Sequence, residues 1–259
     1  MARDFNGTTD RLLQGSAFSG GSLGIGTFSC WIKTSSTTIR CAWGVIETGN
    51  TGIAALYINT QNGSTTTNGS VTWQIRDGSG FQDLGYVAST GINDGAWHHV
   101  VVVRNAGTTR LYIDGTERTL TFSNNTLGSS SITFARPVAI GARNIRGVYD
   151  QYFLGEVAHW AEWDVELSLS DVESLNDGAV PEMVRPSSLV NYYPLAGGDP
   201  ELDIIGLNNL GITGTSVTDD PGKIYYPAMP RVISKKFDAT TFRSAWVARR
   251  PAMIGGGLR

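Results

Sequence analysis

The chain has few cysteines and histidines and no long apolar run, and each shortage excludes a class of protein. Two cysteines and three histidines are too few, and too scattered, for a structural zinc site. Cys30 alternates with apolar residues, so we expect it and Cys41 to be free thiols, with a bridge between neighbouring strands as the alternative. No stretch approaches 18 consecutive apolar residues, so we expect no membrane insertion.

Signals for export and for nucleotide chemistry are also missing. Residues 1–5 are polar and contain no apolar core of the kind that marks a signal peptide. We therefore expect synthesis in a cytosol. The sequence contains no Gly-rich phosphate loop, no dinucleotide fingerprint and no nucleophile elbow, which disfavours nucleotide-dependent and serine-hydrolase activity.

Charge is unevenly distributed along the 259 residues, although the formal net charge is only −3. Residues 223–259 carry eight Lys and Arg against one Asp, a net +7, which leaves −10 on residues 1–222. Such a split is typical of two parts with different partners. We predict an acidic body at 1–222 and a basic, extended C-terminal arm at 223–259.

Glycine is abundant, with 32 residues, and it accompanies short stretches of alternating hydrophobicity. Residues 27–33, 71–76 and 110–114 alternate polar and apolar side chains, which predicts half-buried strands. Asn-Gly and Asp-Gly pairs between such stretches favour tight hairpins. The four valines at 100–103 predict a strand that is covered on both faces.

One short helix is predicted in this otherwise all-β chain. Ser168 or Ser170 has the chemistry of an N-cap, and Gly178 follows the expected last turn. The helix should therefore occupy residues 171–176. The regular spacing of strands and turns before it favours an antiparallel sandwich.

A specific motif points to a family. Residues 97–104 read WHHVVVVR and residues 111–115 read LYIDG, and FLGEV at 153–157 is followed by Leu-Ser at 167–168. Together these segments resemble the laminin-G-like, pentraxin-related jelly rolls of the concanavalin A-like lectin/glucanase superfamily. The resemblance covers residues 5–215 and implies a single domain at 1–222, an all-β antiparallel jelly-roll sandwich. We expect His98 and His99 to be packed strand residues.

Aromatic side chains on a jelly roll could stack on sugar rings. We predict glycan contacts for four of them, with core packing as the alternative for each: Trp43, Trp73, Tyr86 and Tyr149. No cofactor is expected, and the metal ligands are unassigned. A structural calcium ion is left open, since relatives of this fold carry one and loop acids such as Asp10, Asp150 and Asp203 supply suitable oxygens.

The segment Glu162-Trp-Asp164-Val-Glu166 matches the E-x-D-x-E pattern of retaining β-glucanases in the same superfamily. That resemblance implies crowded carboxylates on one strand face, as a nucleophile and acid pair requires. The competing interpretation is that the strand ends here and that Glu166 lies in the turn before the helix. We favour the second, and so expect no enzymatic activity.

The arm combines positive charge with aromatic residues, a composition too apolar for a solvated tail. Its predicted docking residues are Lys235, Lys236, Phe237, Arg243, Trp246, Arg249 and Arg250. We expect the arm to dock on an acidic body, its own or a neighbour's, and not on nucleic acid. The Arg-rich end with its Ile-Gly-Gly-Gly run resembles tailed-phage structural proteins.

These observations predict a non-enzymatic phage structural protein, a capsid decoration or tail-associated subunit. It would be made in the host cytoplasm and located in the virion. Its partners would be other virion subunits or copies of itself, and its jelly roll would face outward, towards cell-surface glycans. The alternatives are a stand-alone carbohydrate-binding module or lectin and, less favoured, a β-glucanase that uses Glu162, Asp164 and Glu166.

Overall fold

The fold is a sandwich of two sheets, seen in a computed structural model that describes residues 1–16, 24–47, 52–128, 132, 134, 136–206 and 208–222. All of these residues belong to one unit, Met1–Tyr226. The predicted arm at 223–259 lies outside the described residues. The same is true of its docking residues, Lys235, Lys236, Phe237, Arg243, Trp246, Arg249 and Arg250.

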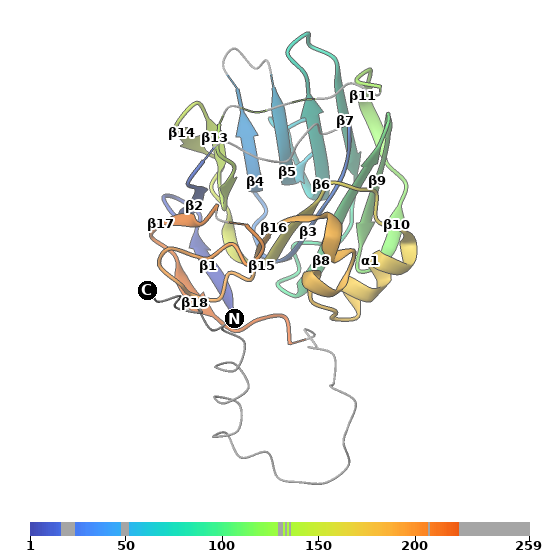
Figure 1. Cartoon of the computed structure of the whole chain (residues 1–259). Coiled ribbons are helices and arrows are strands. Elements are labelled where there is room, and N and C mark those ends of the chain that lie inside the picture. The colour runs from blue at the N-terminus through green and yellow to red at the C-terminus, as the bar shows by residue number, and fades with distance from the viewer. Residues whose placement is uncertain are drawn as a thin grey trace, which may run out of the picture. The chain divides into compact units, whose positions relative to one another are not determined.

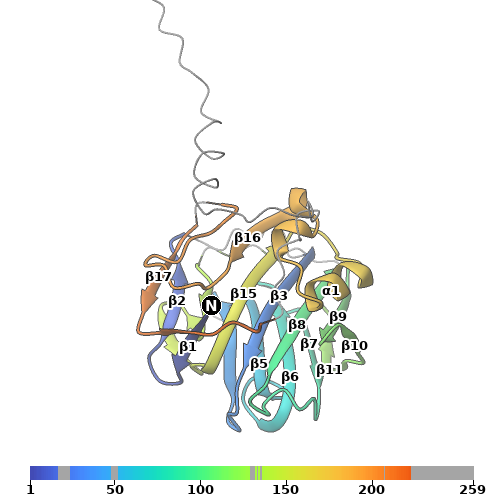
Figure 2. The ribbon, with the colours of Figure 1, turned by 90° about the horizontal axis from the view of Figure 1, so that it is seen from below.

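The two sheets stack face to face (Figures 1 and 2). Sheet A has eight strands, in the order β10 (Thr116–Arg118), β9 (Thr108–Ile113), β8 (Trp97–Asn105), β3 (Ile25–Lys33), β15 (Leu154–Trp163), β1 (Ala2–Asn6) and β18 (Ser216–Thr218), with β16 (Leu189–Tyr193) also paired to β15. Sheet B has ten, in the order β11 (Thr121–Asn125), β7 (Gln82–Val87), β6 (Thr66–Arg76), β5 (Ile53–Thr60), β4 (Arg40–Ile46), β12 (Ala139–Ile140), β2 (Arg11–Gln14) and β17 (Leu210–Thr213), with the hairpin β13 (Arg143–Ile145) and β14 (Val148–Asp150) beside β4. Among the described residues, all strand pairs are antiparallel except β13 with β4. The predicted antiparallel sandwich is confirmed.

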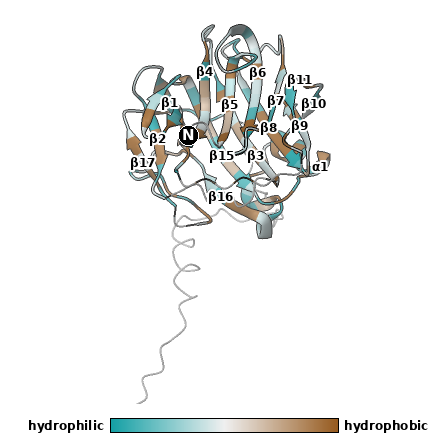
Figure 3. Ribbon diagram, turned by 90° about the horizontal axis from the view of Figure 1, so that it is seen from above, coloured by the Kyte–Doolittle hydropathy of each residue, from teal (hydrophilic) through white to brown (hydrophobic). Residues whose placement is uncertain are grey.

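Alternation along the strands decides which residues face the space between the sheets, and Figure 3 shows hydrophobic and hydrophilic residues interspersed along the strands. On β8, Val100 and Val102 belong to the main core, whereas Val101 and Val103 belong to a second apolar cluster on the opposite face of sheet A. The valine run is therefore buried on both sides, as its sequence predicts.

An aromatic cluster forms the centre of the main core. Phe28 of sheet A lies 4.9 Å from Trp43 and 5.7 Å from Trp73 of sheet B, and 6.3 Å from Trp160 of its own sheet, measured between ring centroids. All three indoles are fully buried. Truncation of one such side chain to alanine typically costs about 3–5 kcal/mol, so this cluster is a major part of what joins the two sheets.

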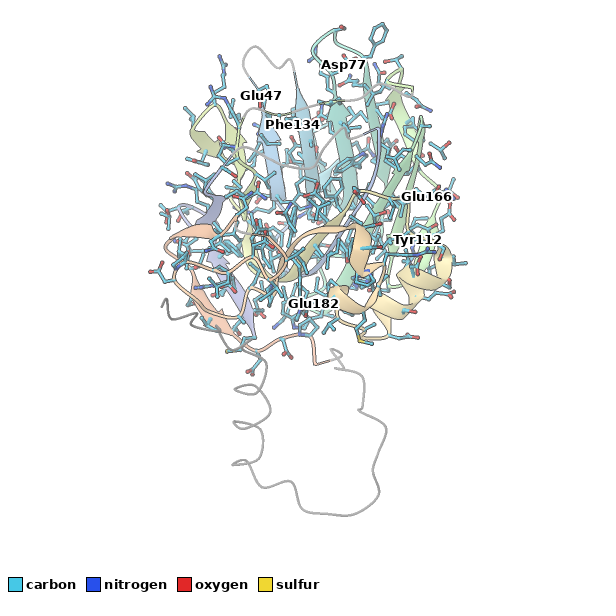
Figure 4. All side chains as sticks on the ribbon, in the orientation of Figure 1. Glu47, Asp77, Tyr112, Phe134, Glu166 and Glu182 are labelled. Atoms are coloured by element: carbon cyan, nitrogen blue, oxygen red, sulfur yellow. The ribbon has the colours of Figure 1, made fainter. Side chains whose placement is uncertain are left out.

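The helix α1 (Leu169–Asn176) covers part of the outer face of sheet A, followed by the 3₁₀ turns η2 (Pro181–Met183) and η3 (Pro186–Ser188). Ser168 Oγ accepts the Asp171 N–H, and the Asp171 carboxylate accepts the Ser168 N–H, which completes a capping box. Val172 and Leu175 pack with Tyr112 of β9, on this side of sheet A (Figure 4). No helix within the described residues is long and apolar enough to cross a membrane.

The two cysteines are free and buried, as predicted. Cys30 lies in the core between the sheets, whereas Cys41 lies in a small cluster on the outer face of sheet B. Different layers therefore separate the two thiols. Burial raises the pKa of Cys30 to about 12, which keeps that thiol protonated and unreactive.

The two histidines of the WHHV motif are structural, as expected. His99 Nε2 lies 2.8 Å from Ser29 Oγ in the buried layer, and the His99 N–H donates to Asp114 Oδ1. The His98 ring lies between two carboxylates, with Nδ1 2.8 Å from Asp114 Oδ2 and Nε2 3.1 Å from Asp94 Oδ1. The motif thus joins the start of β8 to the turn between β9 and β10.

His98 should make stability depend on pH. The hydrogen bond to Asp114 raises its pKa above 6.5, although burial opposes the shift. Its stabilising charge is therefore fully present at pH values below the unfolded pKa and is lost as the pH rises through the folded one. We expect His98→Gln to be less stable than the wild type by about 1 kcal/mol or less in acid, with the difference shrinking in alkali. Urea unfolding at about pH 5.5 and about pH 8.5 measures the difference in stability between the two proteins. A difference that does not change with pH would contradict the prediction.

Candidate functional site

The outer face of sheet B is defined by the alternation along β6. Trp73 and Ile75 point into the main core, so the side chains of Thr72, Gln74 and Arg76 point to the opposite side. Thr72 is buried, whereas Gln74 and Arg76 are half-buried. This face of β6 therefore presents amide and guanidinium groups to the surroundings.

The two strands beyond β6 continue the same surface. On β7, Gln82 pairs with Arg76 and Tyr86 pairs with Thr72; on β11, Thr121 pairs with Tyr86. Directly paired residues share a sheet face. We define the polar band as the half-buried or exposed members of this surface: Gln74, Arg76, Gln82, Tyr86, Thr121 and Asn124.

Two contacts order the polar band. Gln74 Nε2 donates to Gln82 Oε1 over 3.3 Å, which links β6 and β7. At the upper end, the carboxylate of Asp77 accepts the N–H groups of Ser79 and Phe81 and so fixes the β6–β7 turn, where Asp77 lies at the top of the molecule (Figure 4). The Phe81 ring in this turn is 52% exposed.

The neighbouring half of the same face, over β4 and β5, is covered. Tyr57 is fully buried there, and a Cβ placed on Gly63 of the β5–β6 turn would lie 3.7 Å from its ring. The turn is held by Gln151, whose Nε2 donates to Gly63 O over 2.7 Å. Beside it, the Arg143 guanidinium pairs with both carboxylate oxygens of Asp150. The polar band is thus closed on this side and open towards β11.

Within the described residues, the covered half holds a buried polar atom without a hydrogen-bond partner, Gln151 Oε1, while the Tyr57 phenol interacts with the Arg143 guanidinium. Burial raises the pKa of Tyr57, so its phenol stays neutral. Buried polar atoms without a partner are rare and mark a functional role or a missing polar partner. Tyr57 and Gln151 both lie on the covered half of this face, so polar groups that can form hydrogen bonds lie next to the polar band.

The chemistry of the polar band suits a polyhydroxylated ligand. Amide and hydroxyl groups both donate and accept hydrogen bonds, as sugar hydroxyls do, and a guanidinium offers several fixed donors. A tyrosine ring adds an apolar surface next to a polar tip. Binding sites commonly combine an aromatic surface with a few placed polar groups.

Comparison with known proteins identifies the fold family. Residues 7–173 match the family model of the concanavalin A-like lectin/glucanases superfamily. The chain belongs to this family. No curated protein matches the chain.

Solved structures with this concanavalin A-like fold share little sequence with the chain. A heptameric SAP-like pentraxin from Limulus polyphemus is 16% identical with a TM-score of 0.50, covering 68% of this chain and 81% of its own. A putative carbohydrate-binding protein from Bacteroides ovatus is 19% identical with a TM-score of 0.59, covering 86% of this chain and 61% of its own. At these identities the likeness establishes the fold alone.

Two of the four predicted stacking residues are wrong for this concanavalin A-like domain. Trp43 and Trp73 are 1% and 0% exposed, because both side chains point into the core between the sheets. Aromatic rings that contact Phe28 and each other have no face left for a sugar.

Tyr86 and Tyr149, the other two predicted stacking residues, lie in different parts of the structure. Tyr86 belongs to the polar band. Tyr149 of β14 pairs with Asn144 of β13, next to the Arg143–Asp150 pair. The Arg11 guanidinium lies 4.1 Å from the Tyr149 ring centroid. One face of Tyr149 is therefore already occupied. Glycan contact by either tyrosine stays a prediction, and the structure does not bring the two together.

Five of the six residues of the polar band are not predicted as site residues from the sequence. Gln74 and Arg76 belong to the alternating stretch at 71–76 that predicts a strand, and the alternation does separate their face from that of Trp73. Gln82, Thr121 and Asn124 lie in none of the stretches singled out by alternation. Sequence gives no signal for which face is open, because that depends on what covers the sheet.

The three carboxylates of the glucanase-like segment do not converge. Glu162 is buried on β15 and accepts a hydrogen bond from Asn191 Nδ2 over 2.7 Å. β15 ends at Trp163, so Asp164 is exposed beyond it. Glu166 lies in the turn before α1, paired with Arg110, which confirms the expectation for this segment.

The acids proposed for calcium are engaged separately. Asp10 accepts the Asn6 N–H, Asp150 pairs with Arg143, and Asp203 accepts the Tyr192 N–H. Across the part of the chain that the structure describes, no group of three or more His, Cys, Asp or Glu side chains is placed to hold a metal ion. The calcium alternative has no ligand set among these residues.

Glu162 should make the domain less stable as the pH rises from acid to about pH 8. Burial raises its pKa to about 8, although the Asn191 hydrogen bond opposes the shift. The folded state therefore holds a proton that the unfolded state has lost above about pH 4.3, and the stability falls as the pH rises from there to about pH 8. We expect Glu162→Gln to gain stability relative to the wild type over this range, by at most about 1.4 kcal/mol per pH unit. Urea unfolding across the range checks this, and parallel pH curves for the two proteins would contradict it.

Proposed function

We propose that this domain is a non-enzymatic glycan-binding module whose ligand lies on the polar band. One observation carries the proposal: Tyr86 lies half-buried on the same open sheet face as the hydrogen-bonded Gln74–Gln82 pair. This face therefore combines an aromatic surface with fixed amide groups. The domain's place in the lectin/glucanase superfamily supports the proposal.

The arrangement favours binding because its groups are already ordered. The backbones of β6 and β7 are held by six consecutive paired residues on each strand, and the Gln74–Gln82 hydrogen bond restricts two long side chains. A ligand then immobilises fewer rotamers, which lowers the entropic cost of binding. The positions of the two amides and the Tyr86 ring would favour ligands whose hydroxyl groups have a matching spacing.

The glucanase alternative is disfavoured by the environment of its residues. Glu162 is 1% exposed and faces Asn191, whereas Glu166 is paired with Arg110 on the helix side of sheet A. A retaining glucanase requires two carboxyl groups about 5 Å apart on either side of one bond. The buried and paired positions of these two acids support binding without turnover.

The glycan-binding proposal predicts a specific loss in Tyr86→Ala. Loss of the ring should weaken glycan binding about 10-fold, the equivalent of about 1.4 kcal/mol, while the fold is unchanged. A glycan array identifies the ligand and isothermal titration calorimetry measures the affinity. Tyr149→Ala is the matched control, because Tyr149 lies off the polar band, and it should bind as the wild type does. Equal binding by the wild type and Tyr86→Ala, or no glycan binding by the wild type, would contradict the proposal.

We further propose that residues 223–259 attach the domain to a virion or to further copies of itself. The charge distribution supports this, since +7 on the arm and −10 on the body are complementary. Because a viral subunit functions by its position, the glycan-binding face would then be displayed outward by the assembly. The alternative is a stand-alone lectin. Whether the full chain assembles distinguishes this alternative from the attachment proposal.

The attachment proposal is tested by a chain that ends at Gly222. It should keep the melting temperature of the full chain but run as a monomer in light scattering, whereas the full chain should form oligomers that weaken with salt, because screening reduces charge attraction. Lys235→Gln with Lys236→Gln should fall between the two. If the full chain is a monomer that binds glycans, the stand-alone lectin is favoured.

A further inference from the structure

Arg76 is the only charged residue of the polar band, and among the described residues it has no carboxylate partner. Its Nε–H group is buried and finds no acceptor within the same part of the chain. An unsatisfied guanidinium donor is costly to bury. Burying the Arg76 Nε–H therefore lowers the stability of the fold, and a bound anion that accepts this hydrogen bond would remove the penalty.

Other arginines of the domain contrast with Arg76. Arg3 pairs with Glu201, Arg110 with Glu166, and Arg143 with Asp150. The carboxylate nearest to Arg76 in sequence, Asp77, accepts two backbone N–H groups of the β6–β7 turn through Oδ1. Arg76 thus differs from these arginines in lacking a carboxylate within the fold while lying on a face that we propose binds a ligand.

The neighbouring residues leave space for a ligand beside the Arg76 guanidinium. Arg76 is directly opposite Gln82, so an amide lies beside it on the same face. In the turn, Gly80 approaches the guanidinium: a Cβ on Gly80 would lie 3.5 Å from Arg76 Nη2. Glycine at this position keeps that side of the guanidinium free of a side chain.

We propose that the ligand of the polar band is an acidic oligosaccharide, with a sugar carboxylate on Arg76 and a second sugar ring on Tyr86. This inference rests on the proposed glycan-binding function and specifies its ligand class. The planar guanidinium fork matches a carboxylate in geometry, through two parallel charge-assisted hydrogen bonds. Uncharged sugars offer the Arg76 Nε–H neutral hydroxyl acceptors, whose hydrogen bonds are weaker than those of a carboxylate.

The spacing of the polar band sets the length of the ligand. Tyr86 pairs with Thr72, four residues from Arg76 along β6, so the two contacts are about 13 Å apart along the strands. The Gln74–Gln82 amide pair lies between them. A chain of two to three linked sugar rings spans this distance, whereas a single sugar reaches one contact only.

The test compares glycans that differ by the carboxylate. Titration calorimetry of the full chain uses trigalacturonate against its methyl ester, galacturonate as the single sugar, and 3′-sialyllactose against its methyl ester. We expect the wild type to prefer the acid of at least one pair by about 10-fold, with the preference falling as salt rises, and to bind trigalacturonate more tightly than galacturonate. Arg76→Gln should remove the preference, and Arg76→Lys should restore only part of it.

The controls separate this inference from the function on which it rests. Arg118→Gln alters an arginine of sheet A that also has an unpartnered Nε–H among the described residues, and it should leave the preference unchanged. Equal loss in Arg118→Gln and Arg76→Gln would mean general charge attraction and would overturn the assignment of Arg76. Binding of acid and ester with equal affinity would overturn the acidic ligand but leave glycan binding in place. A blank glycan array together with no binding to either pair would contradict the proposed function itself.

Discussion

The contact of Phe28 with three tryptophans is the interaction on which the rest of the structure depends. Phe28 and Trp160 come from sheet A, and Trp43 and Trp73 come from sheet B. Their rings fill the space between the sheets and fix which face of each strand is inward. Because side chains alternate along a strand, every inward tryptophan also determines its outward neighbours. Trp73 in the core thereby places Gln74 on the outside of the sandwich.

The outer faces of the two sheets are then used differently. Sheet A covers part of its outer face with α1, whose Val172 and Leu175 pack with Val101 and Val103, and Arg110 on that face pairs with Glu166. Sheet B covers only the β4–β5 half, with the turn over Tyr57 and the hairpin that carries Arg143. The remaining half keeps polar side chains partly exposed. A rigid sheet with an incomplete cover is a suitable place for recognition.

The sequence was sufficient for the fold but only in part for the site. Alternation, Asn-Gly turns and the WHHV motif predicted the sandwich, and Ser168 and Gly178 predicted the helix, which begins at Leu169, two residues before the predicted start. Trp43 and Trp73 were wrong as ligand contacts, because alternation separates two faces without saying which is inward. Glu162 shows the same difficulty: its spacing resembles a catalytic pattern, yet its burial against Asn191 depends on the pairing of β15 with β16, which local pattern does not contain.

The fold supplies partners for several buried or half-buried polar groups of this domain. The His98 ring, the Arg3 guanidinium and the Glu162 carboxyl each have a partner in another strand or loop, Asp114, Glu201 and Asn191 respectively. Each such pair joins distant segments and is satisfied without a ligand. Arg76 has no such counterpart among the described residues, although it is half-buried at the end of a well-ordered strand. Since unpaired buried donors are costly, an outside acceptor would stabilise this position, and a sugar acid bound on a sheet face lined with amides and tyrosine would supply one.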